Sequence, residues 1–73
     1  MRNDSTTMTK RLGKNLVNLR ASKNQSQQQF ADRLGISRGY LSDLERGVRE
    51  ASLETLATIC KAARTTPNQL LGF

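Results

Sequence analysis

Residues 27–46, QQQFADRLGISRGYLSDLER, indicate two short helices joined by a tight turn. Each helix has an apolar stripe at helical spacing, formed by Phe30, Ala31, Leu34, Leu41 and Leu44. Only Gly35 and Ile36 lie between the two helices. So short a connection is typical of a helix-turn-helix, whose helices cross at roughly 90–120°. We expect Ala31 to permit the close crossing and Ile36 to fill its corner.

The ends of both helices are marked by capping residues. Ser26 with Gln29 three residues later forms a capping-box pattern at the start of the first helix. Gly35 follows the last apolar residue of that helix, where a left-handed backbone favours glycine. Ser37 is placed to cap the second helix. These signals predict helices over residues 27–34 and 38–46.

The second helix has a polar outer face that the core does not need. Its members are Arg38, Gly39, Tyr40, Ser42, Asp43 and Arg46. One interpretation is a helix that reads DNA. The alternative is an ordinary helical hairpin within a larger helical core, whose polar face is simply solvated.

The remaining chain predicts a single helical domain over residues 9–73, preceded by a flexible, polar N-terminal arm over residues 1–8. Helices are expected over about 9–23, with Leu12, Leu16 and Leu19 inward, and over 53–63, capped by Ser52. We expect Gly13 to allow close approach of another backbone. The second of these helices has an apolar face predicted from Leu53, Leu56, Ala57, Ile59, Cys60 and Ala63. Thr66 and Pro67 predict a short fifth helix.

Composition excludes several classes of protein. The chain has 73 residues, one cysteine and no histidine, so neither an internal disulfide nor a Cys/His metal site is expected. No paired carboxylates or phosphate-binding glycine loop indicate an enzyme, and we expect no catalytic residue, cofactor or small-molecule ligand. Without an apolar span or signal peptide, we expect a cytoplasmic protein that does not bind membranes.

The net charge of +6 favours a polyanionic partner. Residues 1–25 carry a net +5, whereas residues 26–50 have four arginines and four acidic residues and are neutral. The basic N-terminal quarter could therefore hold a phosphate backbone without reading sequence, with Lys14 and Lys23 as candidate contacts. The alternative is a basic surface that serves solubility.

Nearly the whole chain, from about Leu12 to Phe73, resembles the lambda-repressor-like (Cro/repressor, XRE-type) helix-turn-helix regulators. The resemblance rests on LGKNLVNLR, on SQQQFADRLGISRGYLSDLERG and on SLETLATICKAARTTPNQLLGF. It implies an all-α, compact five-helix DNA-binding domain whose second and third helices form the motif. The RGYLSDLERG run is similar to the controller proteins of restriction–modification systems.

The resemblance also implies which residues contact DNA. The second motif helix would lie in the major groove, with base readout by Arg38, Tyr40, Ser42, Asp43 and Arg46. Arg38 could instead contact phosphate, Tyr40 could cover the core edge, and Asp43 could serve as a local salt-bridge partner. Phosphate contacts are expected from Gln27, Gln28, Ser37 and Arg49.

Two residues have an expected structural role. The family pairs an arginine that ends the first helix with a glutamate that ends the third, which are here Arg20 and Glu45. Their alternative is two unrelated surface charges. The chain departs from the family at Glu50-Ala51, where Asn-Pro is common, and at Arg64, where glycine is common. We therefore expect the turn at Arg64 to differ from the usual left-handed turn.

Apolar residues crowd the C-terminus, and Leu70, Leu71 and Phe73 form a candidate dimer interface. Alternatively, Leu70 and Phe73 close the monomer core. The leading function is a transcriptional regulator that binds a palindromic double-stranded DNA operator as a homodimer, with RNA polymerase as a further partner. The operator position would decide between activator and repressor. The alternatives are a phage-type repressor, or an antitoxin or adaptor that uses this fold mainly for protein binding.

Overall fold

The computed structural model describes the backbone of residues 4–64 and the side chains of residues 8–64. Within this range the chain is entirely helical outside its turns and loops. The helices are α1 (Asp4–Ser22), α2 (Gln27–Leu34), α3 (Arg38–Glu45) and α4 (Leu53–Ala63). The predicted fifth helix and the candidate dimer residues Leu70, Leu71 and Phe73 lie outside the described residues.

The caps of the helix-turn-helix are those that the sequence predicts. Ser26 and Gln29 form the capping box of α2, and Gly35 ends that helix with φ +73°. The Ser37 hydroxyl accepts a hydrogen bond from the Tyr40 N–H at the start of α3. Since each cap satisfies backbone groups that the helix itself leaves open, both boundaries are determined locally.

The first helix begins earlier than predicted. We expected this helix to begin at about residue 9, but α1 starts at Asp4, so the predicted start of the helix was wrong. Met8 packs against the core and Thr9 is buried. The chain is therefore already held by the core at Met8, one residue before the predicted start of the helix. The polar residues before them include no helix breaker, so the helix extends backwards from that contact.

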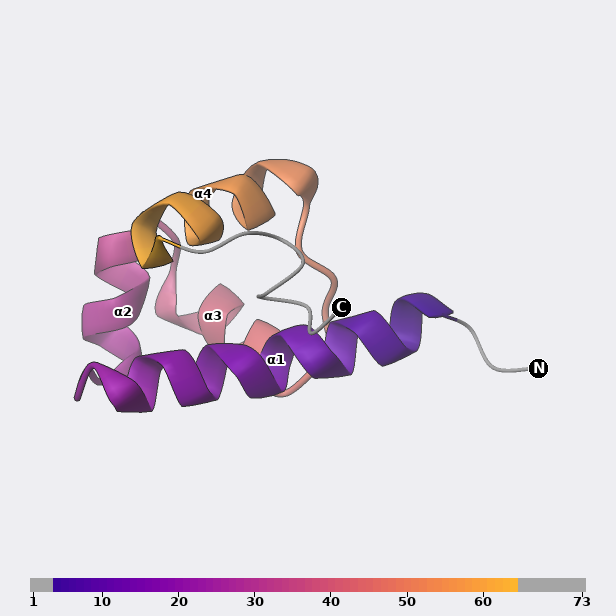
Figure 1. Cartoon of the computed structure of the whole chain (residues 1–73), viewed down its shortest axis with the longest axis horizontal. Helices are drawn as coiled ribbons and strands as arrows, with labels where there is room; N and C mark the ends of the chain where they lie inside the picture. Colours follow the sequence, from indigo (N-terminus) through magenta and orange to yellow (C-terminus); the bar gives the residue numbers. More distant parts are fainter. Residues whose placement is uncertain (1–3, 65–73) are drawn as a thin grey trace.

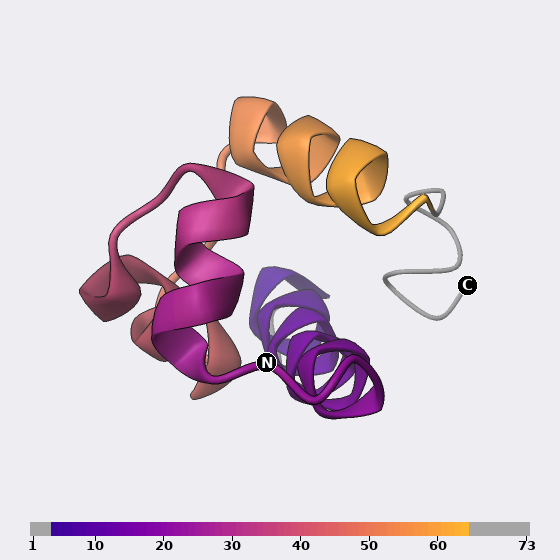
Figure 2. The same ribbon diagram turned by 90° about the vertical axis from the view of Figure 1, so that its left-hand side faces the viewer.

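The four helices surround one core. Figures 1 and 2 show α1 along one side, α4 on the opposite side and the α2–α3 pair between them at one end. α3 packs against both α1 and α2, and α2 also packs against α4. The buried apolar residues come from all four helices: Leu12, Leu16, Phe30, Ala31, Leu34, Leu41, Leu44, Ile59 and Cys60. Ile36 packs on this core from the turn, as predicted.

Two predictions about α4 were wrong. Leu53 is 86% exposed and Ala57 is exposed, so the buried face of α4 is narrower than its apolar residues suggest. Arg64 ends α4 in the left-handed conformation, with φ 56° and ψ 46°, despite its side chain. The usual turn thus forms without the usual glycine, at some cost in conformational strain.

Gly13 lets α1 approach the end of α3. A Cβ atom at this position would lie 2.5 Å from the Leu44 carbonyl oxygen and 2.7 Å from that of Glu45. Both distances are shorter than a van der Waals contact, so only glycine fits. The close backbone approach that we predicted for Gly13 is therefore confirmed, and its partner is α3.

None of the helices in the described part of the chain is both long and apolar enough to span a membrane.

Candidate nucleic-acid interface

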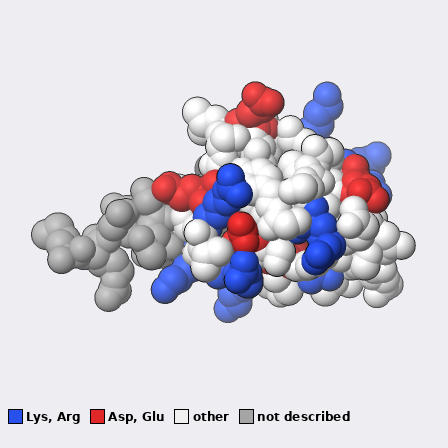
Figure 3. Space-filling model, turned by 180° about the vertical axis from the view of Figure 1, so that it is seen from behind, with Lys and Arg blue, Asp and Glu red and all other residues white. Residues whose placement is uncertain are grey.

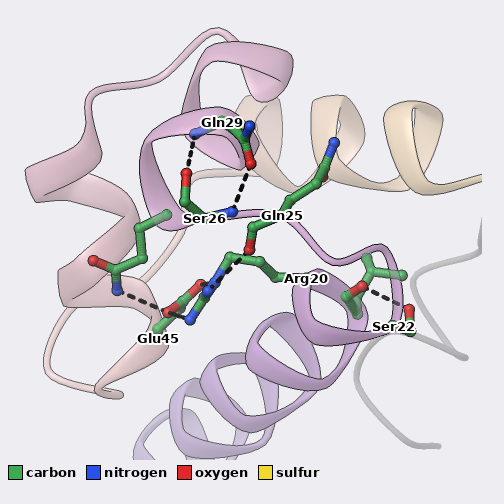
Figure 4. A network of polar contacts seen from close by, with 8 residues as sticks. Arg20, Ser22, Gln25, Ser26, Gln29 and Glu45 are labelled. Atoms are coloured by element: carbon green, nitrogen blue, oxygen red, sulfur yellow. Dashed lines mark hydrogen bonds and ion pairs between the residues drawn. The ribbon is translucent and has the colours of Figure 1, made fainter.

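The position of α3 depends on a polar cluster at its C-terminal end. Glu45, the last residue of α3, accepts hydrogen bonds from Arg20 Nε (2.8 Å, to Oε2) and Nη2 (3.1 Å, to Oε1). The predicted pair is thus present, in the two-pronged geometry that suits guanidinium and carboxylate. The Glu45 side chain is 4% exposed and that of Arg20 22%. Figure 4 shows the two side chains facing each other between α1 and α3.

Arg20 also connects α1 to the segment that precedes α2. Its Nη1 donates to the main-chain oxygen of Gln25 at 3.1 Å. The hydrogen bond that Arg20 donates to Glu45 raises the pKa of Arg20 above its already high normal value, and the charge attraction adds to this, against an opposing effect of burial. The guanidinium therefore stays charged, and it joins α1, the α2 approach and α3.

Gln27 is drawn into the same cluster. Its side-chain Nε2 donates to Glu45 Oε1 at 2.9 Å, so this amide connects the start of α2 to the end of α3. We predicted a phosphate contact at this position. With the amide engaged, the main-chain N–H of Gln27 in the first turn of α2 is the group that remains suited to phosphate, because such N–H groups have no partner within the helix.

The outer face of α3 lies opposite its buried residues Leu41 and Leu44. Arg38, Gly39 and Arg46 are exposed on it, and Ser42 and Asp43 are half-buried. Arg38 makes no hydrogen bond or ion pair with any residue between 8 and 64 in this structure. Its guanidinium is therefore available to a partner. The polar residues of this face carry hydrogen-bond donors and acceptors, the groups that can contact base edges in a major groove.

Asp43 forms ion pairs with two arginines. Its Oδ1 accepts a hydrogen bond from Nη2 of Arg46, and its Oδ2 lies 3.8 Å from Nη1 of Arg49. The salt-bridge alternative for Asp43 is therefore observed. All three side chains are partly or well exposed, so these contacts contribute little to stability. Their effect is to hold two positive charges beside the outer face of α3.

Tyr40 is turned toward the scaffold. Its hydroxyl donates to Thr55 Oγ1 on α4 at 3.3 Å, and its ring packs against the core. The Arg49 guanidinium carbon lies 4.8 Å from the ring centroid, a distance that permits a cation–π contact. This placement favours the second alternative for Tyr40, covering the core edge, with an added role in orienting Arg49.

Two further candidates for phosphate contact have local partners. Gln28 is exposed, and its Nε2 donates to Asp32 Oδ1 at 2.8 Å along α2. Ser37 is exposed and uses its oxygen to cap α3. Since a hydroxyl that accepts one hydrogen bond can still donate its own proton, Ser37 remains suited to phosphate.

The two candidate lysines come from α1 and from the segment that follows it. Lys14 is exposed on α1, next to Gly13, whereas Lys23 is exposed just after α1 ends. In the described part of the chain no ion pair holds either of them. Figure 3 shows the molecule from behind, with lysine and arginine side chains spread over this face and acidic groups between them. The structure thus offers a dispersed basic surface beside the more balanced motif.

Two residues that support this site were not predicted from the sequence. The Thr55 hydroxyl accepts a hydrogen bond from the Tyr40 hydroxyl, and the main-chain carbonyl of Gln25 accepts one from Arg20. A threonine in a helix and a main-chain carbonyl carry no pattern of their own, so only the three-dimensional structure reveals them. Among residues 8–64, no cluster of metal-ligating side chains occurs.

Comparison with known proteins agrees with this geometry. A family model described as helix-turn-helix matches residues 16–70. The control protein C.BamHI of Bacillus amyloliquefaciens is 40% identical over 62 residues, which cover 84% of this chain and 76% of the relative. The control protein C.SmaI of Serratia marcescens is 37% identical over 60 residues, with 82% and 71% coverage.

A solved structure shows the same fold. The restriction-modification controller protein C.AhdI from Aeromonas hydrophila superimposes with a TM-score of 0.77 at 32% sequence identity. The match covers 85% of this chain and 94% of that protein. The helical architecture, including the placement of the motif, is therefore shared with a protein of similar length.

Proposed function

Because the chain belongs to the helix-turn-helix family of DNA-binding transcriptional regulators, we propose that it binds a palindromic operator as a homodimer, as the controller of a restriction–modification system. Two relatives are named control proteins, and a structural neighbour is named a restriction-modification controller. The relatives are regulators rather than enzymes. We place its action in the cytoplasm, on double-stranded DNA.

The observation that carries the proposal is the way α3 is held. Arg20 from α1 and Gln27 from α2 both donate to Glu45, while Gly13 admits the end of α3 directly onto α1. A helix fixed in this way can present its outer face with little freedom, which precise contact with base edges requires. The scaffold therefore supports α3 as the reading helix.

Arg38 is the principal candidate for reading a base. It is exposed near the N-terminal end of α3 and is not engaged by any described residue. A guanidinium in the major groove can donate two hydrogen bonds to guanine O6 and N7, which discriminate by about 1–3 kcal/mol. Arg46 and Ser42 extend the contact along the helix, while Asp43 orients Arg46.

Phosphate contacts are assigned around this helix. They comprise the main-chain N–H groups of Gln27 and Gln28, the Ser37 hydroxyl, Arg49, and the dispersed lysines Lys14 and Lys23. Tyr40 positions Arg49 under this proposal, through their ring contact. Such contacts fix the register of the protein on DNA without carrying sequence information.

A homodimer follows from the size of one module. Two reading helices about 34 Å apart would enter successive major grooves on one face of the duplex. Pairing two half-sites gives a small domain an affinity that one half-site cannot supply. We assign the dimer contact to Leu70, Leu71 and Phe73. Where the regulator activates transcription, we propose that it also contacts RNA polymerase.

A mobility-shift assay on fragments of the source genome tests the proposal. Arg38→Ala is expected to relax sequence preference, because it removes a base contact. Lys14→Ala is expected to weaken binding to all DNA alike and to lower the salt slope by about one. Wild-type protein that binds every fragment equally at physiological salt would refute the regulator proposal.

The controller assignment has a separate test. A regulator of this class should bind a fragment next to genes for a restriction endonuclease and a methyltransferase. A preferred fragment within a prophage would indicate a phage-type repressor, and one beside a toxin gene would indicate an antitoxin. Either result would leave DNA binding intact and refute only the controller assignment.

A further inference from the structure

Gly39 is a glycine that the fold does not require. A Cβ atom at this position would meet no heavy atom within 4 Å, and the backbone φ is not positive. Any L-residue could therefore occupy the site without strain. Glycine also destabilises a helix relative to alanine, because it loses more conformational freedom on folding. On grounds of folding alone, another residue would be preferred.

The other glycines with described structure differ from Gly39. Gly13 has the Leu44 carbonyl 2.5 Å from its would-be Cβ, and Gly35 and Gly47 have φ of +73° and +72°. Each of these three positions is explained by the chain itself. The reason for glycine at position 39 must therefore lie outside the described fold.

The place of Gly39 on α3 indicates where that reason lies. Residue 39 is on the side of the helix opposite Leu41 and Leu44, both of which are fully buried. Arg46 lies about two turns further along the same outer line, and both residues are exposed. Position 39 thus lies on the midline of the outer face that we assign to DNA, in the first turn of α3.

We infer that Gly39 is a specificity-determining position, at which the absence of a side chain lets the edge of a base pair approach the α3 backbone. The inference rests on the proposed function, and it specifies which chemical group of the DNA is recognised at one position of the operator. The group that fits against a bare Cα and peptide is apolar and projects into the major groove. Among the base edges, only the thymine C5 methyl has that character. Gly39 therefore selects an A·T pair by shape, beside the hydrogen bonds of Arg38.

The test begins with an operator selected from a randomised duplex library by the wild-type protein. Gly39→Ala and Gly39→Ser are compared with wild type for melting temperature, for affinity to random duplex DNA and for affinity to the selected operator. Gly39→Ala is expected to raise Tm by roughly 2–6 °C, because alanine favours the helix. Random-DNA affinity should stay within about twofold, while operator affinity should fall about tenfold or more.

Deoxyuridine substitution then identifies the methyl group. Each thymine of the selected operator is replaced in turn by deoxyuridine, which lacks only the C5 methyl. Wild type should lose about threefold or more in affinity at one thymine per half-site. Gly39→Ala should be insensitive to that replacement, because its own methyl already prevents the contact. Serine should behave like alanine at this site.

The outcomes separate this inference from the proposed function. If wild type selects no operator, the proposed function fails. If it selects one that Gly39→Ala binds as tightly, the inference fails and the proposed function stands. If Gly39→Ala loses operator affinity but the wild-type protein tolerates every deoxyuridine replacement without loss of affinity, the assignment to thymine is overturned.

Discussion

Arg20 in the last turn of α1 and Glu45 at the end of α3 are 25 residues apart in sequence, yet they form a two-pronged ion pair of 2.8 and 3.1 Å. The pair fixes the end of the helix whose outer face we assign to DNA. Gln27 adds a third donor to the same carboxylate from α2. One short helix thus contains both a structural contact, at its C-terminal end, and the residues that we assign to DNA, on its outer face.

Removing one partner of this pair should destabilise the domain. Arg20→Ala leaves the Glu45 carboxylate buried without its cation, and we expect the free energy of unfolding to fall by about 2–4 kcal/mol. Glu45→Ala should cost a similar amount. The double variant should lose clearly less than the sum of the two, because the second change removes a group already without its partner. Urea unfolding measures all three, with Arg33→Ala, an exposed arginine on α2, as control. Strictly additive losses would show that the pair is not coupled.

Gly13→Ala tests the approach of α1 to α3. The added methyl would meet the Leu44 and Glu45 carbonyls, and we expect a loss of about 1–3 kcal/mol despite the better helix propensity of alanine. Gly39→Ala, where a Cβ meets nothing, is the matched control and should not destabilise the fold. Equal thermal stability of the two alanine variants would contradict the close contact at Gly13.

Asp43→Asn should release Arg46 and Arg49 from their shared carboxylate. With one negative charge removed and two arginines freed, we expect tighter binding to random duplex DNA and a salt slope that is steeper by about one. Preference for operator over random DNA should fall. Glu54→Gln removes the same charge from the first turn of α4, and fluorescence anisotropy compares the two. If both variants change DNA affinity and salt slope equally, the effect of Asp43→Asn comes from net charge alone and not from the release of the two arginines.

Arg64→Gly should stabilise the domain. Arg64 has a left-handed backbone, which costs an L-residue about 1–2 kcal/mol relative to glycine, partly offset by the greater freedom of glycine when unfolded. We expect a net gain of roughly 0.5–1 kcal/mol, read as a higher midpoint in thermal unfolding. Arg64→Ala removes the charge but keeps the strain, so it should show no such gain. A gain of equal size in both variants would point to charge instead.

Local signals in the sequence predicted most of the helix-turn-helix. The serines at positions 26, 37 and 52 cap the helices that they were expected to cap, and Gly35 has its left-handed turn. Such features depend on neighbours within a few residues, so the sequence carries them directly. The bounds of α2 and α4 match the predictions for the same reason.

Contacts with distant partners were predicted only in part. Leu53 was expected in the core, but which part of an apolar helix face is buried depends on the helix packed against it. The Gln27 amide is engaged by Glu45 and the Tyr40 hydroxyl by Thr55, partners 18 and 15 residues away. No local pattern marks such pairs. The roles of the DNA-facing residues stay predictions, because their partner is a second molecule.

The central claim is that the outer face of α3 reads sequence in double-stranded DNA. The most direct test is the ratio of wild-type affinities for a duplex selected from a randomised library and for a scrambled duplex of equal length, at physiological salt. A specific regulator predicts a ratio of about 10³ or more, which Arg38→Ala reduces. Equal affinities for the two duplexes would contradict the claim.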